Sequence, residues 1–162
     1  VNVGADDSTA FMNDFCSVMT CVKTGIATDI FGPTANYKYY KGDYSGWPND
    51  ASNMNNPTAV LNDGSYLKFL SKNNCTGNGV NSCGAIAVDI NGAKGPNMRG
   101  MDLFNFYVVF KNGTYSILPA GVPGDTVAGI DLSPSGCTAA STSQNTSNGC
   151  TYKRLYDTDH MP

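Results

Sequence analysis

Six cysteines, grouped in three pairs that are close in the sequence, constrain this chain more than any other feature. The pairs are Cys16 with Cys21, Cys75 with Cys83, and Cys137 with Cys150. An even number at short spacings favours disulfides, whereas a zinc site needs C-x-x-C pairs or Cys/His clusters, which are missing from the sequence. Disulfides persist in oxidising compartments. The cysteines therefore predict a secreted, disulfide-bonded protein in which each cysteine bonds its neighbour in sequence.

Length and composition indicate one domain that is rich in strands and loops. A chain of 162 residues is long enough to bury a single core. All 13 acidic residues are Asp, and Asp, Asn and Gly favour turns and caps over helix interiors. Lys and Arg total 10, so the chain has no basic excess for nucleic-acid binding. Residues 1–162 are expected to form one globular domain.

Residues 6–24 contain the one helical pattern that the sequence offers. Apolar residues recur there at spacings of three and four: Phe11, Met12, Phe15, Val18, Met19 and Val22. On an ideal helix, Cys16 and Cys21 would lie roughly 8–9 Å apart on divergent faces, which is too far for a disulfide. Either the helix ends before Cys21 or these two cysteines pair elsewhere.

Residues 59–118 predict an antiparallel sheet. Short apolar runs alternate with Asn-Gly and Asp-Gly turn signals, as in Asn62-Asp63-Gly64-Ser65. One face of the run 103–110 is strongly apolar and consists of Phe104, Phe106, Val108 and Phe110. The expected fold class is α+β, with an N-terminal amphipathic helix packed on an antiparallel β-meander. The helix stripe should bury this apolar face, and Tyr107 on the opposite face should be less buried.

The remaining region, 119–162, is rich in Gly, Ser and Thr and would be typical of a linker without its two cysteines. A disulfide between Cys137 and Cys150 would close it and restrict the unfolded chain. We expect a disulfide-closed C-terminal region.

The sequence offers no convincing active site. A Ser–His–Asp triad would need His160, three residues from the end, and an even cysteine count leaves no free thiol as nucleophile. The segment Asp89–Asp102 places oxygen donors around glycines, but Ala93 and Gly100 stand where an EF-hand needs ligands. A structural turn and a calcium loop both remain open there, and the turn is favoured. We expect no catalytic residue, no cofactor and no metal.

An aromatic run follows the helix and has two interpretations. Its members are Tyr37, Tyr39, Tyr40, Tyr44 and Trp47. The rings either pin a long loop to the body or stack on a glycan or another partner. Four of them are the candidate partner-binding residues: Tyr39, Tyr40, Tyr44 and Trp47.

Three stretches resemble the globular heads of bacterial type IV pilins and type II secretion pseudopilins. The run CGAIAVDINGAKGPNMRGMDLFNFYVVFKNG, from Cys83 to Gly113, is similar to their strand, "DxNGxKGPN" turn and "G-x-D-x-F-x-F" strand. AVLNDGSYLKFL, from Ala59 to Leu70, resembles their "VLxDG" hairpin. GCTYKRLYDTD resembles their C-terminal disulfide region, and the likeness covers most of the chain.

The resemblance implies a structural subunit of a pilus or pilin-like surface filament that serves adhesion, motility, DNA uptake or secretion. Its partners would be other pilin subunits, bundled through an N-terminal anchor helix that precedes this head, and the isolated head would be a monomer. It would lie on the cell surface, after a stage anchored in the inner membrane and facing the periplasm. The alternatives are a pseudopilin of a type II secretion system and a secreted glycan- or partner-binding module that uses residues 37–47.

Overall fold

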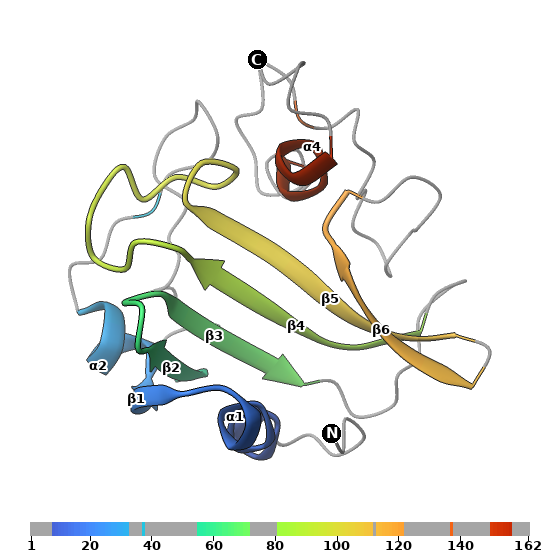
Figure 1. Ribbon diagram of the computed structural model, residues 1–162, viewed down its shortest axis with the longest axis horizontal. Coiled ribbons are helices and arrows are strands. Elements are labelled where there is room, and N and C mark those ends of the chain that lie inside the picture. Colours follow the sequence, from blue (N-terminus) through green and yellow to red (C-terminus); the bar gives the residue numbers. More distant parts are fainter. Residues whose placement is uncertain are drawn as a thin grey trace.

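The computed structural model describes residues 8–32, 37, 55–71, 81–111, 113–121, 137 and 150–156. Six strands form one antiparallel sheet, in which neighbours in sequence are neighbours in space (Figure 1). The elements, in chain order, are α1 (Ser8–Val18), β1 (Cys21–Ile26), α2 (Ala27–Phe31), β2 (Pro57–Leu61), β3 (Tyr66–Ser71), β4 (Asn81–Asp89), β5 (Leu103–Lys111), β6 (Thr114–Pro119) and α4 (Cys150–Tyr156). No helix in the described part of the chain is long and apolar enough to span a membrane.

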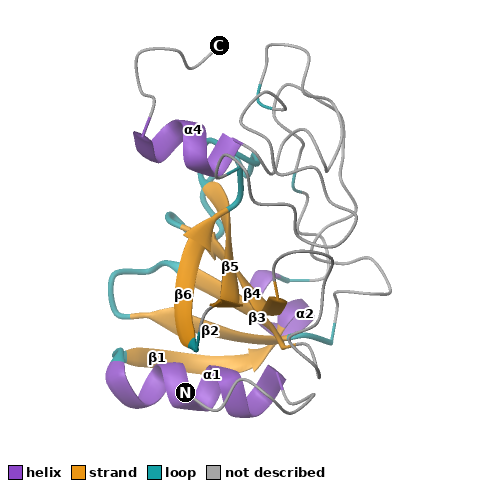
Figure 2. Ribbon diagram, turned by 90° about the vertical axis from the view of Figure 1, so that its right-hand side faces the viewer, coloured by secondary structure: helices purple, strands orange, loops and turns teal. Residues whose placement is uncertain are grey.

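The expected fold class is wrong. The described chain is mostly an open six-stranded antiparallel sheet with a short helix near each end, instead of a helix packed on a β-meander (Figures 1 and 2). Helix α1 has 11 residues and packs mainly on β2 and β3. Because a helix is about 10 Å across and strands are about 4.8 Å apart, one helix covers about two strands. The helix therefore leaves the part of this sheet face toward β6 only partly covered.

The helix also ends earlier than its apolar pattern predicted. It stops at Val18, and residues 21–24, expected to be helical, lie in strand β1, which pairs with β2. β-branched Val22 and Thr24 favour the extended chain, and the partner strand supplies the hydrogen bonds. Cys16 and Cys21 then come within 5.4 Å between their Cα atoms and form a disulfide. Of the two alternatives for this pair, an early helix end is therefore confirmed.

On one sheet face, α1 contributes to a core that centres on Phe69. This ring is fully buried, and its centroid lies 5.4 Å from that of Phe11 and 5.3 Å from that of Phe15. Val108 belongs to the same cluster. The predicted stripe is wrong in its second half, because Val18 is 80% exposed and Val22 is 62% exposed in β1.

The opposite sheet face is buried as well, which the sequence did not predict. Helix α2 places Ile30 and Phe31 against Ala87 and Leu103 there. Tyr107 is buried on this face, whereas Phe106 is only half-buried. The expected ranking of these two neighbours is therefore wrong, because the face that carries Tyr107 is buried around this position, where Tyr107 packs with Val109 and Ala120.

The β2–β3 hairpin follows the turn chemistry of its sequence. The Asp63 carboxylate accepts a hydrogen bond from the Ser65 N–H at 2.9 Å, and Gly64 has a φ of 90°, which glycine adopts without strain. Another glycine, Gly84 in β4, permits a close approach: a Cβ there would lie 2.6 Å from the Leu70 carbonyl oxygen. β3 and β4 can pair this closely because position 84 has no side chain.

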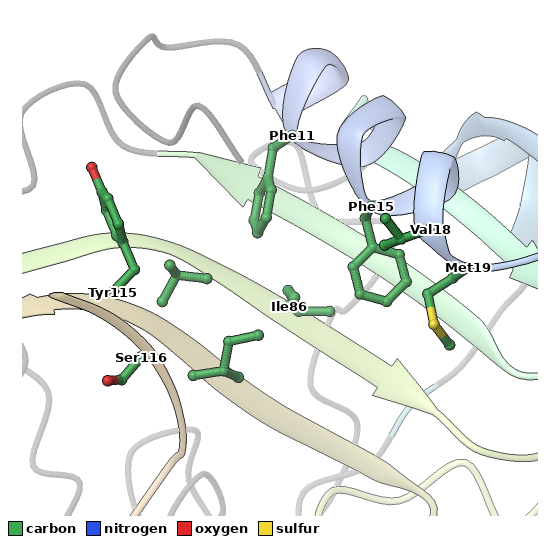
Figure 3. A pocket seen from close by; sticks show the side chains of 9 residues that line it. Phe11, Phe15, Val18, Met19, Ile86, Tyr115 and Ser116 are labelled. Atoms are coloured by element: carbon green, nitrogen blue, oxygen red, sulfur yellow. The ribbon is translucent and has the colours of Figure 1, made fainter.

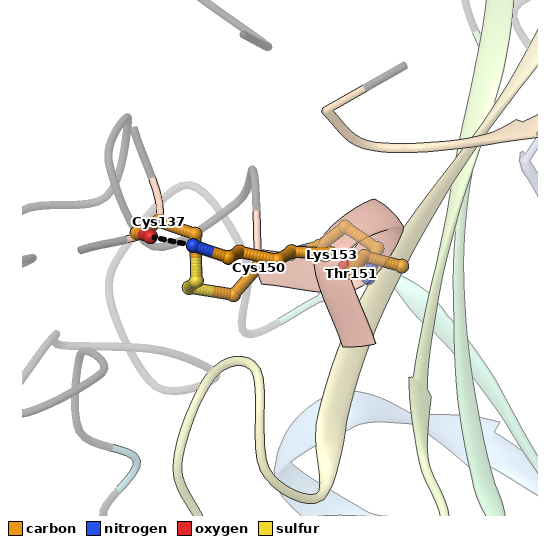
Figure 4. The surroundings of a disulfide bond; sticks show 5 residues. Cys137, Cys150, Thr151 and Lys153 are labelled. Carbon is orange, nitrogen blue, oxygen red and sulfur yellow. Dashed lines mark hydrogen bonds between the residues drawn. A yellow bond between two sulfur atoms is a disulfide. The ribbon is translucent and has the colours of Figure 1, made fainter. Parts of the chain in front are cut away.

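Helix α4 is fixed against the ends of β5 and β6. The Asn105 N–H donates to Thr151 Oγ1 at 2.9 Å, and the Tyr152 N–H donates to the Ala120 carbonyl at 2.8 Å. A disulfide joins Cys150 to Cys137, as expected (Figure 4). Cys83 is also disulfide-bonded, and its expected partner at position 75 lies outside the described residues.

Candidate functional site

The segment Asp89–Asp102, the candidate ion loop of the sequence, is a turn organised around two buried carboxylates. Asp89 ends β4 and is 0% exposed, and Asp102 precedes β5 and is 2% exposed. The Ile90 N–H donates to the Asp102 carbonyl at 3.0 Å, which brings the two ends of the turn together. The sequence placed both carboxylates in one turn, and the structure confirms that they lie close together.

Two backbone N–H groups donate hydrogen bonds to the Asp102 carboxylate. The Asn97 N–H donates to it at 2.6 Å, and the Met98 N–H donates to its other oxygen. The Asn91 side-chain amide adds a longer contact of 3.4 Å. A carboxylate that accepts several N–H bonds stabilises the turn by satisfying donors that would otherwise be buried without partners.

Asp89 is held by a residue from far away in the sequence. The Tyr37 hydroxyl donates to its Oδ2, and the Asn91 N–H donates to its Oδ1 at 3.0 Å. Burial raises the pKa of Asp89 to about 6, against the opposing effect of these hydrogen bonds. Burial, followed by the nearby Asp89 charge, also raises the pKa of the Tyr37 hydroxyl. Sequence analysis missed this pair, because nothing in the sequence links positions 37 and 89.

At position 37, the structure supports the loop-anchoring interpretation of the aromatic run. Tyr37 is 1% exposed and packs edge-on against Phe31, so it anchors its segment to the sheet. The four candidate partner-binding residues lie outside the described residues: Tyr39, Tyr40, Tyr44 and Trp47. His160 lies outside them too.

Among the described residues, no group of three or more His, Cys, Asp or Glu side chains is placed to hold a metal ion. Two amide oxygens, Asn91 Oδ1 and Asn97 Oδ1, are buried without a hydrogen-bond partner. A cation bound in this turn would have to use these two oxygens as ligands. The Asp102 carboxylate is already engaged by N–H donors, which favours the structural turn.

We expect calcium to leave the stability of this protein unchanged. Thermal unfolding in millimolar calcium and then in chelator should give midpoints within about 1 °C of each other. A site of micromolar affinity would instead add about 4 kcal/mol at a thousandfold excess and move the midpoint by several degrees. Such a shift, abolished in Asp89→Ala, would show that the turn is an ion site.

The second candidate site is an apolar groove on the sheet face that α1 only partly covers. Its volume is about 440 Å³, and Figure 3 shows α1 side chains along one side and β6 residues on the other. The lining residues are Phe11, Phe15, Val18, Met19, Ile86, Val108, Tyr115, Ser116 and Ile117. None of them carries a charge at neutral pH, so the groove offers apolar contact and no ion pair.

Several of these apolar side chains remain in contact with water. Val18 is 80% exposed, Ile117 57%, Tyr115 49% and Met19 44%. Contiguous exposed apolar surface on a folded domain marks an interaction site, whereas scattered single residues do not. The sequence predicted the apolar stripe of α1, but not that its last residues would face a groove.

Comparison of the chain with protein-family models, with curated proteins and with solved structures found no match.

Proposed function

We propose that this chain is the globular head of a structural subunit in a bacterial pilin-like surface filament, and that it acts by packing against other subunits. The single observation that carries the proposal is the uncharged groove between α1 and β6. Water-exposed apolar side chains such as Val18 and Ile117 gain free energy when a neighbouring subunit covers them. The disulfides Cys16–Cys21 and Cys137–Cys150 agree with an oxidising, extracytoplasmic location.

The resemblance of the stretch Cys83–Gly113 to pilin heads supports the same proposal. This stretch forms β4, the turn with two buried carboxylates, and β5. The Asp102 carboxylate accepts hydrogen bonds from the backbone N–H groups of Asn97 and Met98 within this turn. A turn built in this way serves to position two strands, which suits a structural role.

The groove gives the test of this function. Val18→Lys should leave the fold intact, because the side chain is 80% exposed. The variant chain should be depleted at least about tenfold from filaments sheared off the source bacterium, since a buried charge without a partner is costly at an interface. The measurement is an immunoblot of sheared filaments against total cell protein.

Asn13→Lys is the matched control, because Asn13 is an exposed α1 residue that does not line the groove. It should enter filaments as the wild type does. Absence of the wild-type chain from sheared filaments, together with a block in protein secretion when the gene is deleted, would replace this proposal with the pseudopilin alternative. Equal incorporation of both variants would remove the groove from the assembly surface.

A further inference from the structure

The two edges of the open sheet differ in how they are protected. β1 forms one edge, and its register with β2 is interrupted between Cys21 and Lys23. A bulge and an exposed lysine, here Lys23, are the usual devices that prevent an edge strand from pairing with another chain. The β1 edge is therefore protected against pairing with a strand of another chain.

The other edge, β6, has no such protection over residues 114–118. This stretch, Thr-Tyr-Ser-Ile-Leu, contains no charge and no proline, and its register with β5 is unbroken. Its first four residues are exposed. Within the described chain, β6 pairs with β5 alone.

The register shows which backbone groups of β6 point away from the sheet. Lys111 and Thr114 form the pair that closes the hairpin, and only two residues lie between them. In a two-residue hairpin the closing pair is hydrogen-bonded, and hydrogen-bonded and non-hydrogen-bonded pairs then alternate. Tyr115 and Ile117 are thus non-hydrogen-bonded with β5 and direct their N–H and C=O groups outward. Pro119 falls in the same outward-facing set, as it must because it has no N–H to donate to β5.

We propose that β6 pairs with β6 of a second copy of this chain, antiparallel and about a two-fold axis at Ser116. In this register Tyr115 of each copy lies opposite Ile117 of the other, so the outward-facing groups on each side meet. Each of these pairs exchanges two hydrogen bonds, and the two-fold axis generates the second pair. The two sheets become one continuous sheet.

The absence of charge on β6 favours a second copy of the chain as its partner, and the small area of the contact predicts that the pairing is weak. An isologous interface places a patch against itself, so a charged strand would repel its copy, whereas residues 114–118 are uncharged. The exposed Tyr115 and Ile117 side chains of the two copies come together on the groove face. Two six-residue strands bury less than the roughly 1,200 Å² of stable interfaces. The isolated chain is therefore mostly monomeric at micromolar concentration and pairs when it is crowded.

Disulfide trapping of the purified full chain tests this register. Across the two-fold axis the two Ser116 residues form a non-hydrogen-bonded pair with Cα atoms about 4.5 Å apart, which a disulfide can bridge. Ser116→Cys should form a covalent dimer under mild oxidation at about 100 µM, at least about tenfold faster than Thr114→Cys. Thr114 is also exposed but lies two residues from the axis, so its two copies are about 13 Å apart.

Ile117→Pro in the Ser116→Cys background separates pairing from chance collision. Proline removes an outward-facing N–H but none that bonds β5, and it should abolish the fast cross-link while circular dichroism confirms the fold. Equal dimerisation rates for the cysteine variants at positions 116 and 114, or a fast cross-link that survives Ile117→Pro, would overturn the proposal. None of these outcomes depends on the filament role, so the two proposals can fail separately.

Discussion

Phe69→Ala is expected to lower the free energy of unfolding by about 3–5 kcal/mol, because truncating a fully buried phenylalanine loses its transfer free energy and leaves a cavity. Phe69 is 0% exposed and contacts both Phe11 and Phe15, so the cavity would open beneath α1. The rings cannot close it freely, since the disulfide between Cys16 and Cys21 ties the helix end to β1. Urea denaturation with the disulfides intact measures the change.

Leu70→Ala is the matched control for this prediction. Leu70 is the next residue of β3, and its side chain is 37% exposed. The expected loss is below about 1 kcal/mol, as for most partly exposed positions. Similar losses at positions 69 and 70 would contradict a core centred on Phe69 and would mean that α1 contributes little to stability.

Stability should rise as the pH falls from 7 to 4.5, which is opposite to the usual behaviour of a paired carboxylate. Burial raises the pKa of Asp89 to about 6, from the 3.8 that is usual for an aspartate. The folded state therefore holds this proton more tightly than the unfolded state does, and the stabilisation is complete below about pH 4 and lost as the pH rises through 6. At about 1.4 kcal/mol per pKa unit the shift corresponds to at most about 3 kcal/mol, and we expect about 1–2 kcal/mol after solvent screening.

Asp89→Asn identifies the group that is responsible. The amide cannot ionise but still accepts a hydrogen bond from Tyr37, so the variant should have a flatter profile than the wild type between pH 4.5 and 7. The measurement is the free energy of unfolding at several pH values in that range. A wild-type profile that is flat there, or an Asp89→Asn profile that retains the full slope, would show that the Asp89 carboxylate does not set this dependence.

The sequence by itself determined the local features of this protein. The alternation of residues 103–110 places β5, and Asp63-Gly64 and Asn91-Gly92 mark reversals where the chain must turn. The short spacing of Cys137 and Cys150 predicted their disulfide, which the structure confirms. These features depend on side-chain periodicity, turn chemistry and short loops, all of which act between residues close in the sequence.

Only the tertiary structure decided where the helix ends and which faces are buried. Residues 21–24 continue the helical apolar pattern but lie in β1, because β2 offers a strand partner that an isolated segment lacks. Tyr37 and Asp89 are 52 positions apart, and only the packing of Tyr37 near the end of β4 joins them. Exposure of the groove likewise depends on α1 covering β2 and β3 and leaving β6 open. Such contacts join elements that are distant in the sequence, so no local pattern encodes them.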